Sequence, residues 1–126
     1  MSSKFGLRIL FGLALVALLA ACSSGAAATP AQSTQTVTLN ALDNFKYDPM
    51  TITGKVGQPI HVIINNKGVL EHSFVIDQLN VKLEHIQAGT TGDVTFTPTT
   101  AGTFTFYCNT PGHKEAGMTG TLTITQ

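Results

Sequence analysis

Three residues with metal-binding side chains follow one another at equal spacing near the end of the sequence: Cys108, His113 and Met118. Proline and glycine residues between them favour a tight loop, which would bring the three side chains together. A second histidine, His72, opens an earlier run of apolar residues. Two imidazoles, one thiolate and one thioether combine soft sulfur with borderline nitrogen donors. Such a set suits copper in both its lower and its higher oxidation state.

The rest of the chain must position these donors, and from Thr36 onward its pattern is that of short strands. Runs rich in Val, Ile, Thr and Phe are separated by Gly, Pro, Asn and Asp. Strands are expected near residues 36–42, 50–55, 59–65, 72–77, 92–97, 102–108 and 118–125. This pattern predicts an all-β fold, a two-sheet antiparallel sandwich. Residues 79–87 are the only stretch that could form a short helix, and only weakly.

The alternation of side chains along three of these strands predicts which residues face the interior. Successive side chains of a strand point to opposite faces of its sheet. His72, Cys108 and Met118 each share their parity with apolar residues of their own strand. We therefore expect the three side chains to point inward and to meet His113 at one end of the sandwich.

Each candidate ligand also has a plainer interpretation. A lone inward histidine is more often a core residue, and an inward methionine is more often packing. Zinc is the next metal to consider, but structural zinc favours four Cys or His ligands, and methionine is a poor fourth. The four residues taken together favour copper. His61 is expected to face solvent and His85 lies in the uncertain segment 79–87, so both are interpreted as structural.

The N-terminus has the pattern of an export signal. Lys4 and Arg8 precede an apolar run from Ile9 to Ala21, which is too short to cross a bilayer. The segment 19–23, LAACS, resembles a bacterial lipoprotein signal, in which the cysteine is acylated. The alternative is an ordinary secretory signal with a cysteine there by chance. If Cys22 carries lipid, Cys108 has no disulfide partner.

These features predict three parts of the chain: a signal peptide over residues 1–21, a lipidated Cys22 with a flexible tether over 22–35, and one domain over 36–126. The tether contains only small and polar residues, which bury too little apolar area to fold. The lipid anchor would hold the domain at the extracytoplasmic face of the cell membrane. No arginine follows Arg8 and the lysines are scattered singly, so nucleic-acid binding is not expected.

Residues 45–126 resemble a small cupredoxin, a type 1 blue copper protein. The resemblance rests on the segments 45–49 (FKYDP), 71–74 (EHSF) and 107–113 (YCNTPGH). Four residues separate Cys108 from His113 and four separate His113 from Met118. This spacing is similar to that of the auracyanins, which are membrane-tethered blue copper proteins. The family implies an eight-strand Greek-key sandwich, so an irregular further strand is expected within residues 78–91.

The resemblance also implies a role for each residue of the site. Cys108 would be the thiolate whose short bond to copper gives a strong visible colour. His72 and His113 would complete the trigonal plane, with the edge of His113 reaching solvent, and Met118 would be the long axial ligand. Ser73 and Asn109 would support the ligands. Asn109 would place its backbone amide near the sulfur, and the side chain of Ser73 would tie the two ligand loops together.

Electron transfer is the function that this resemblance implies. The chain would carry single electrons between membrane-bound redox complexes, as a monomer, with an apolar docking patch of Val69, Leu70, Pro111 and Ala116 near His113. The alternative is a copper delivery or storage protein that hands copper to an oxidase. An enzyme is not expected, because an inward cysteine capped by methionine offers neither an exposed thiolate nor an open coordination position.

Overall fold

A computed structural model describes residues 32–126 of the protein. The predicted signal peptide, Cys22 and most of the predicted tether lie outside these residues. The strands are β1 (Gln35–Leu42), β2 (Lys46–Asp48), β3 (Thr51–Lys55), β4 (Ile60–Asn66), β5 (His72–Ile76), β6 (Val81–Ile86), β7 (Thr91–Phe96), β8 (Gly102–Tyr107) and β9 (Thr119–Thr125). A single 3₁₀ turn, η1 (Asp77–Leu79), is the only helical element within the described part of the chain.

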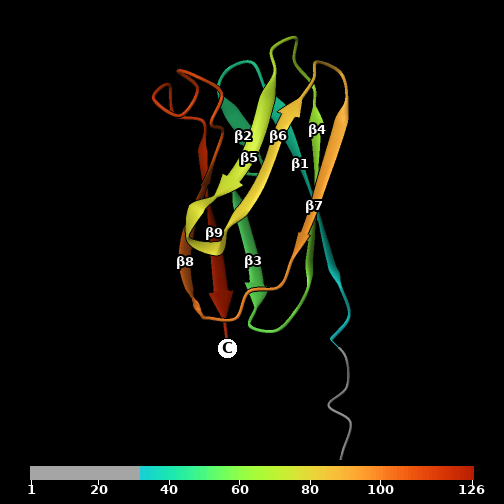
Figure 1. Ribbon diagram of the computed structural model, residues 1–126, viewed down its shortest axis with the longest axis vertical. Coiled ribbons are helices and arrows are strands. Elements are labelled where there is room, and N and C mark those ends of the chain that lie inside the picture. The colour runs from blue at the N-terminus through green and yellow to red at the C-terminus, as the bar shows by residue number, and fades with distance from the viewer. Residues whose placement is uncertain (1–31) are drawn as a thin grey trace, which may run out of the picture.

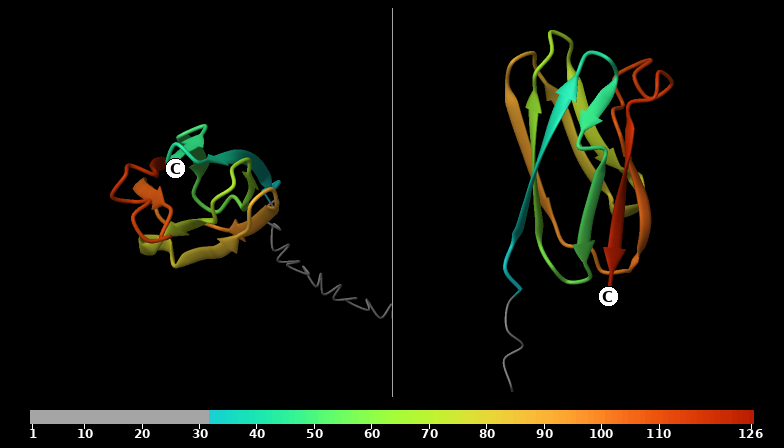
Figure 2. Two further views of the ribbon diagram at one scale, coloured as in Figure 1. Left: turned by 90° about the horizontal axis from the view of Figure 1, so that it is seen from above. Right: turned by 180° about the vertical axis from the view of Figure 1, so that it is seen from behind.

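The strands form two sheets packed face to face, so the predicted all-β sandwich is confirmed (Figures 1 and 2). One sheet has the order β2-β1-β4-β7 and the other β3-β9-β8-β5-β6. The sheets are not antiparallel throughout, however, because β1 pairs with β4 and β3 pairs with β9 in parallel. Each parallel pair arises because the intervening chain crosses to the other sheet before it returns.

The described residues form two more strands than the seven that the residue pattern predicted. The short strand β2 pairs with β1, and β3 then joins the opposite sheet. Pro49 separates them, since proline cannot donate to a strand ladder. The second is β6, which lies within the segment 79–87, where the residue pattern alone suggested a weak helix. This strand is the irregular one that the family implied: its pairing with β5 shifts register, and His85 has a positive φ of 59°.

The core lies between the two sheets and follows the predicted alternation of side chains. In β4, buried Ile60, Val62 and Ile64 alternate with half-buried residues. In β9, Leu122 and Ile124 are buried on the inner face. Removing these apolar side chains from water supplies the main driving force for folding, about 25 cal/mol per Å² buried. All five residues of β5 are buried, which also encloses Ser73.

The loops after β1, β4 and β8 all lie at one end of the sandwich, which we call the loop end (Figure 1). The chain enters β1 at the opposite end, which is also the end where the C-terminus lies (Figure 1). Among residues 32–126, no helix is both long and apolar enough to span a bilayer. The sandwich therefore presents the loop end and the first residue of β1 at opposite poles.

Candidate metal centre

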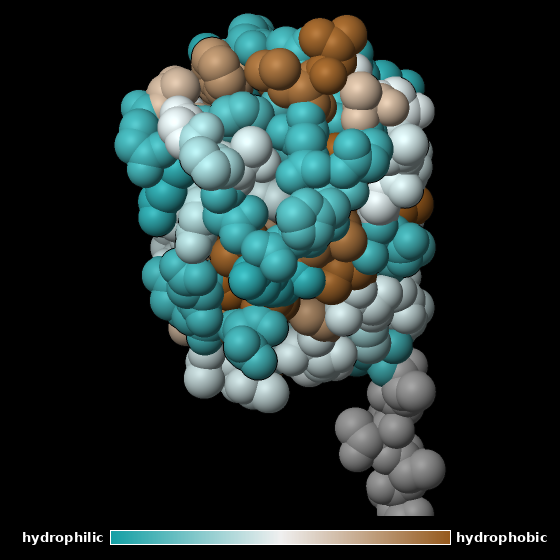
Figure 3. Space-filling view, turned by 45° about the horizontal axis from the view of Figure 1, so that its top comes forward, coloured by the Kyte–Doolittle hydropathy of each residue, from teal (hydrophilic) through white to brown (hydrophobic). Residues whose placement is uncertain are grey.

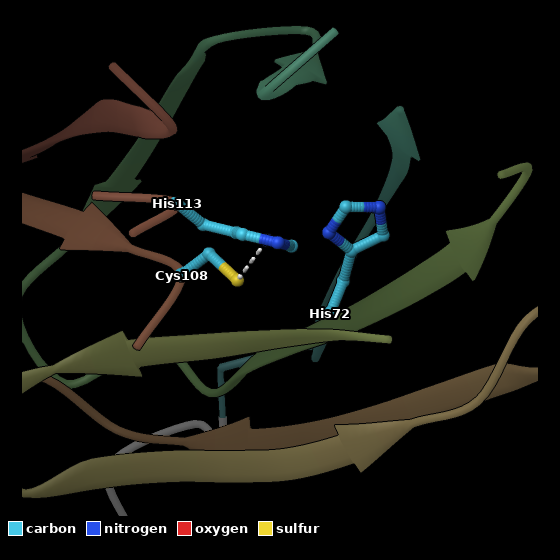
Figure 4. A group of neighbouring side chains, drawn as sticks. All are labelled: His72, Cys108 and His113. Carbon is cyan, nitrogen blue, oxygen red and sulfur yellow. Dashed lines mark hydrogen bonds between the residues drawn. The ribbon is translucent and has the colours of Figure 1, made fainter. Parts of the chain in front are cut away.

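The sandwich brings three of the predicted ligands together at the loop end. His72 is the first residue of β5, Cys108 directly follows β8, and His113 lies in the loop between β8 and β9. One ligand atom from each of these residues lies within 4.8 Å of the others. Figure 4 shows one ring nitrogen of His72 pointing toward the sulfur of Cys108 and the ring of His113. Side chains distant in the sequence thus converge on one point.

The cluster is sealed from solvent except at one edge. His72 and Cys108 are fully buried, whereas His113 is 7% exposed, as expected for the residue nearest the surface. The Cys108 Sγ lies 3.4 Å from His113 Nδ1. Cys108 is a free thiol. A buried, close-set sulfur and two nitrogens can bind a metal without admitting a substrate molecule to it.

Met118 lies at the far end of the same loop and is also fully buried. Its backbone N–H donates to the His113 carbonyl at 3.0 Å, and its own carbonyl accepts the N–H of Cys108 at 3.1 Å. Gly112 and Gly117 have φ of +80° and +100°, a left-handed conformation that favours glycine. The loop is therefore folded back on itself, and the backbone places Met118 beside the cysteine.

The ring of His72 fits a metal-binding role because it is buried without hydrogen bonds. Its Nδ1 and Nε2 are the only buried side-chain polar atoms without a hydrogen-bond partner among residues 32–126. Leaving such a group unpaired costs about 1–3 kcal/mol, which a metal bond would offset. Burial, the largest influence, lowers the pKa of His72 and keeps the imidazole neutral, the form that ligates metals.

Ser73 links two segments of the site beside the sulfur of Cys108. Its buried hydroxyl donates to Cys108 Sγ at 3.4 Å and accepts the backbone N–H of Asn109 at 2.8 Å. The backbone amide of Asn109 is thus linked to the sulfur through the hydroxyl of Ser73. The side chain of Asn109 instead donates to Glu84 Oε1 at 2.7 Å, which holds the loop against β6.

Three residues near the centre were not identified from the sequence as parts of the site. The hydroxyl of Tyr47 donates to the Ser73 carbonyl at 2.5 Å, and burial raises the pKa of this phenol well above its usual range. The ring of Phe45 packs edge-on against His113, with centroids 5.0 Å apart. Asp43 approaches the ring of His72. The motif FKYDP contains two of the three, but nothing in it shows which side chains reach the ligands.

The other two histidines lie outside the cluster, as the sequence predicted. His61 Nε2 is 3.1 Å from Asp93 Oδ2 on the β2-β1-β4-β7 sheet. His85 is exposed on β6, and its Nδ1 lies 3.0 Å from Glu71 Oε1. Neither ring belongs to the His72, Cys108 and His113 group.

Comparison with known proteins identifies the family. The cupredoxin-like domain matches residues 12–124. A copper-resistant cuproprotein CopI of Rubrivivax gelatinosus is 31% identical over 113 residues, which cover 75% of this chain and 68% of that protein. A plastocyanin of Nostoc punctiforme is 33% identical over 131 aligned positions, covering 90% and 91% of the two chains. The crystal structure of reduced auracyanin from the photosynthetic bacterium Roseiflexus castenholzii aligns with a TM-score of 0.68 at 23% identity, covering 75% of this chain and 99% of that one.

The chain therefore belongs to the cupredoxin-like family, and the fold, the donor atoms and the relatives agree on one copper ion as its cofactor. A bound copper would supply one-electron chemistry, since the ion cycles between its cuprous and cupric states.

Proposed function

We propose that the protein is a type 1 blue copper electron carrier. Cys108 would supply the thiolate, His72 and His113 the two imidazole nitrogens, and Met118 a weak thioether donor to the copper. The observation that carries the proposal is the buried convergence of one sulfur and two imidazole nitrogens within 4.8 Å. Met118 is also buried, and its carbonyl accepts the N–H of Cys108, so its thioether would be the fourth donor and the second soft one.

The surroundings of the cluster support an electron carrier because they hold the ligands in place. Ser73 bridges Cys108 and Asn109, and Tyr47 anchors the backbone of Ser73. A site that does not rearrange lets the copper gain or lose an electron with little reorganisation. Its closure also disfavours an enzyme, because no ligand position is open to a substrate.

The loop end offers a surface on which a redox partner could dock. Val69 is 81% exposed and Leu70 is 39% exposed, and Pro111 and Ala116 are exposed on the neighbouring loop. Figure 3 shows hydrophobic residues gathered at this end of the molecule. An apolar patch at the same end of the sandwich as His113 suits a weak, short-lived contact. We propose that membrane-bound redox complexes dock here and that the protein acts as a monomer.

We further propose that Cys22 is lipidated and that the domain works at the extracytoplasmic face of the cell membrane. The support is the segment LAACS after a short apolar run. In the described part, the chain enters β1 at the pole opposite the loop end (Figure 1). A tether attached there would leave the docking surface free. Loss of acyl labelling in Cys22→Ala, with labelling intact in the parent, is the expected result.

Copper delivery or storage is the second candidate, and the 31% identical copper-resistant cuproprotein favours it. The two functions differ in how tightly copper is held. An electron carrier keeps its copper through many redox cycles and exchanges electrons quickly with a small redox protein. A delivery protein loses Cu(I) to a competing chelator or an apo-oxidase within the same period. Stopped-flow oxidation and chelator competition on the copper-loaded protein therefore decide between them, and rapid loss of copper would contradict the carrier.

A further inference from the structure

The carboxylate of Asp43 lies against the side of His72 that the metal cluster does not use. Asp43 belongs to the loop between β1 and β2, and its Oδ1 is 3.4 Å from His72 Nε2. One nitrogen of His72 points toward Cys108 and His113, and the other points away from them (Figure 4). The distance is somewhat longer than an ordinary N–H···O hydrogen bond.

The same carboxylate organises the loop that leads into His72. Its Oδ2 accepts the N–H of Val69 at 2.8 Å, and its Oδ1 accepts the N–H of Leu70 at 3.2 Å. Position 68 must be glycine for this arrangement, because a Cβ built there would lie 1.9 Å from Asp43 Oδ1. The loop between β4 and β5 is therefore wrapped around one carboxylate, which is held near Nε2 of the His72 imidazole.

A carboxylate in this place has a specific chemical consequence for a ligand histidine. A metal-binding imidazole usually donates its second N–H to a carboxylate, a carbonyl or a water, and this bond selects the tautomer and orients the ring. His72 has no other polar partner on this side, since its Nε2 is buried and otherwise unpaired. The negative charge would also favour the cupric over the cuprous ion.

We propose that Asp43 is a positioning residue for the metal centre: its carboxylate accepts the Nε2–H of His72, leaves Nδ1 free for the metal, and stabilises the cupric state. This inference rests on the proposed function for its metal, but the contact itself can be tested without copper. The side chain of Asp43 is 35% exposed, so solvent screens part of its charge and a moderate effect is expected.

The variant that removes the charge with the least change of shape is Asp43→Asn, whose single amide oxygen can keep one of the two backbone N–H contacts, to Val69 or to Leu70. Asp93→Asn is the matched control: it makes the same change in a carboxylate that also faces an imidazole, that of His61 at 3.1 Å, in the other sheet. Cu(II) and Cu(I) affinities are measured by chelator competition, and the reduction potential by voltammetry. We expect Asp43→Asn to weaken Cu(II) binding about tenfold relative to Cu(I), which raises the potential by about 59 mV. Asp93→Asn should change neither the relative copper affinities nor the reduction potential.

A second measurement uses the metal-free wild-type protein and does not depend on copper or on any variant. Long-range ¹H–¹⁵N correlation spectra should show His72 as the Nε2–H tautomer. The Nδ1–H tautomer, or equal potentials for Asp43→Asn and Asp93→Asn, would overturn the inference. Failure of the wild-type protein to bind copper would instead contradict the proposed function, and the tautomer alone would then decide on the contact between Asp43 and His72.

Discussion

Replacing Ser73 by alanine tests how the sulfur of the metal centre is supported. The buried hydroxyl has two contacts: it donates to Cys108 Sγ at 3.4 Å and accepts the N–H of Asn109 at 2.8 Å. Ser73→Ala removes both and adds no steric conflict, because alanine is smaller. The N–H of Asn109 is then left without its acceptor. An unsatisfied polar group of this kind costs about 1–3 kcal/mol, so the metal-free variant should lose that much free energy of unfolding.

The same substitution should lower the reduction potential. A thiolate carries more negative charge when the metal beside it is reduced, so a donor to the sulfur favours the reduced state. Hydrogen bonds to charged groups contribute about 1.5–3 kcal/mol, but most of this is common to both oxidation states. If about a third of the lower figure is differential, the potential falls by about 20 mV, from 59 mV per tenfold change in a one-electron equilibrium.

Urea unfolding of the metal-free protein and voltammetry of the copper-loaded protein measure the two effects separately. The control is Thr91→Ala, which removes an exposed hydroxyl that donates to Asn65 Oδ1 at 2.8 Å. This exposed change should stay within about 0.5 kcal/mol. If Ser73→Ala were as stable as that control and its potential were unchanged, the bridging role of Ser73 would be refuted.

Three further predictions follow from single contacts. Gly120→Ala should destabilise the fold by about 1–3 kcal/mol in urea unfolding, since a Cβ would lie 2.1 Å from the buried ring of Phe106; wild-type stability would show that the ring can move aside. Glu84→Gln should have a lower free energy of unfolding than the wild type at neutral pH, and this difference should shrink as the pH is lowered. The hydrogen bond from Asn109 is the largest influence that lowers the pKa of Glu84, so its contribution is present above the unfolded-state pKa of about 4.3 and is lost as the pH falls through the folded value. A deficit that is constant from about pH 6 to pH 3 would contradict this. Met118→Gln should keep the visible colour and lower the potential, and an unchanged potential would remove Met118 from the axial position.

The residues that converge could be predicted because period-two alternation is a local property of the chain. Alternation alone places Cys108 and Met118 on the inner face, and both are buried in the structure. The proline and glycine residues between them similarly predict a closed loop. His72 followed from the same rule in another strand. Local pattern and family resemblance together therefore identified the cluster and its copper.

The contacts behind the ligands could not be predicted, because they join loops that are remote in sequence. Asp43 is 29 positions from His72 along the chain, and only the pairing of β1 with β4 brings their loops together. Tyr47 belongs to the segment FKYDP that was noted in the sequence, but its hydrogen bond to the carbonyl of Ser73 depends on how the sheets pack. The type of element in residues 81–86, strand β6, could not be predicted from the residue pattern either. Its buried and exposed residues follow neither a strand period nor a helix period.

The visible spectrum of the oxidised, copper-loaded protein tests the central claim most directly, when compared between the wild type and Cys108→Ser. The account predicts an intense blue absorption that arises from the bond between the Cys108 thiolate and copper. It predicts that this absorption is absent from Cys108→Ser, which keeps His72, His113 and Met118. A colourless wild-type complex, or a variant that stays blue, would contradict the assignment of Cys108 as the copper ligand.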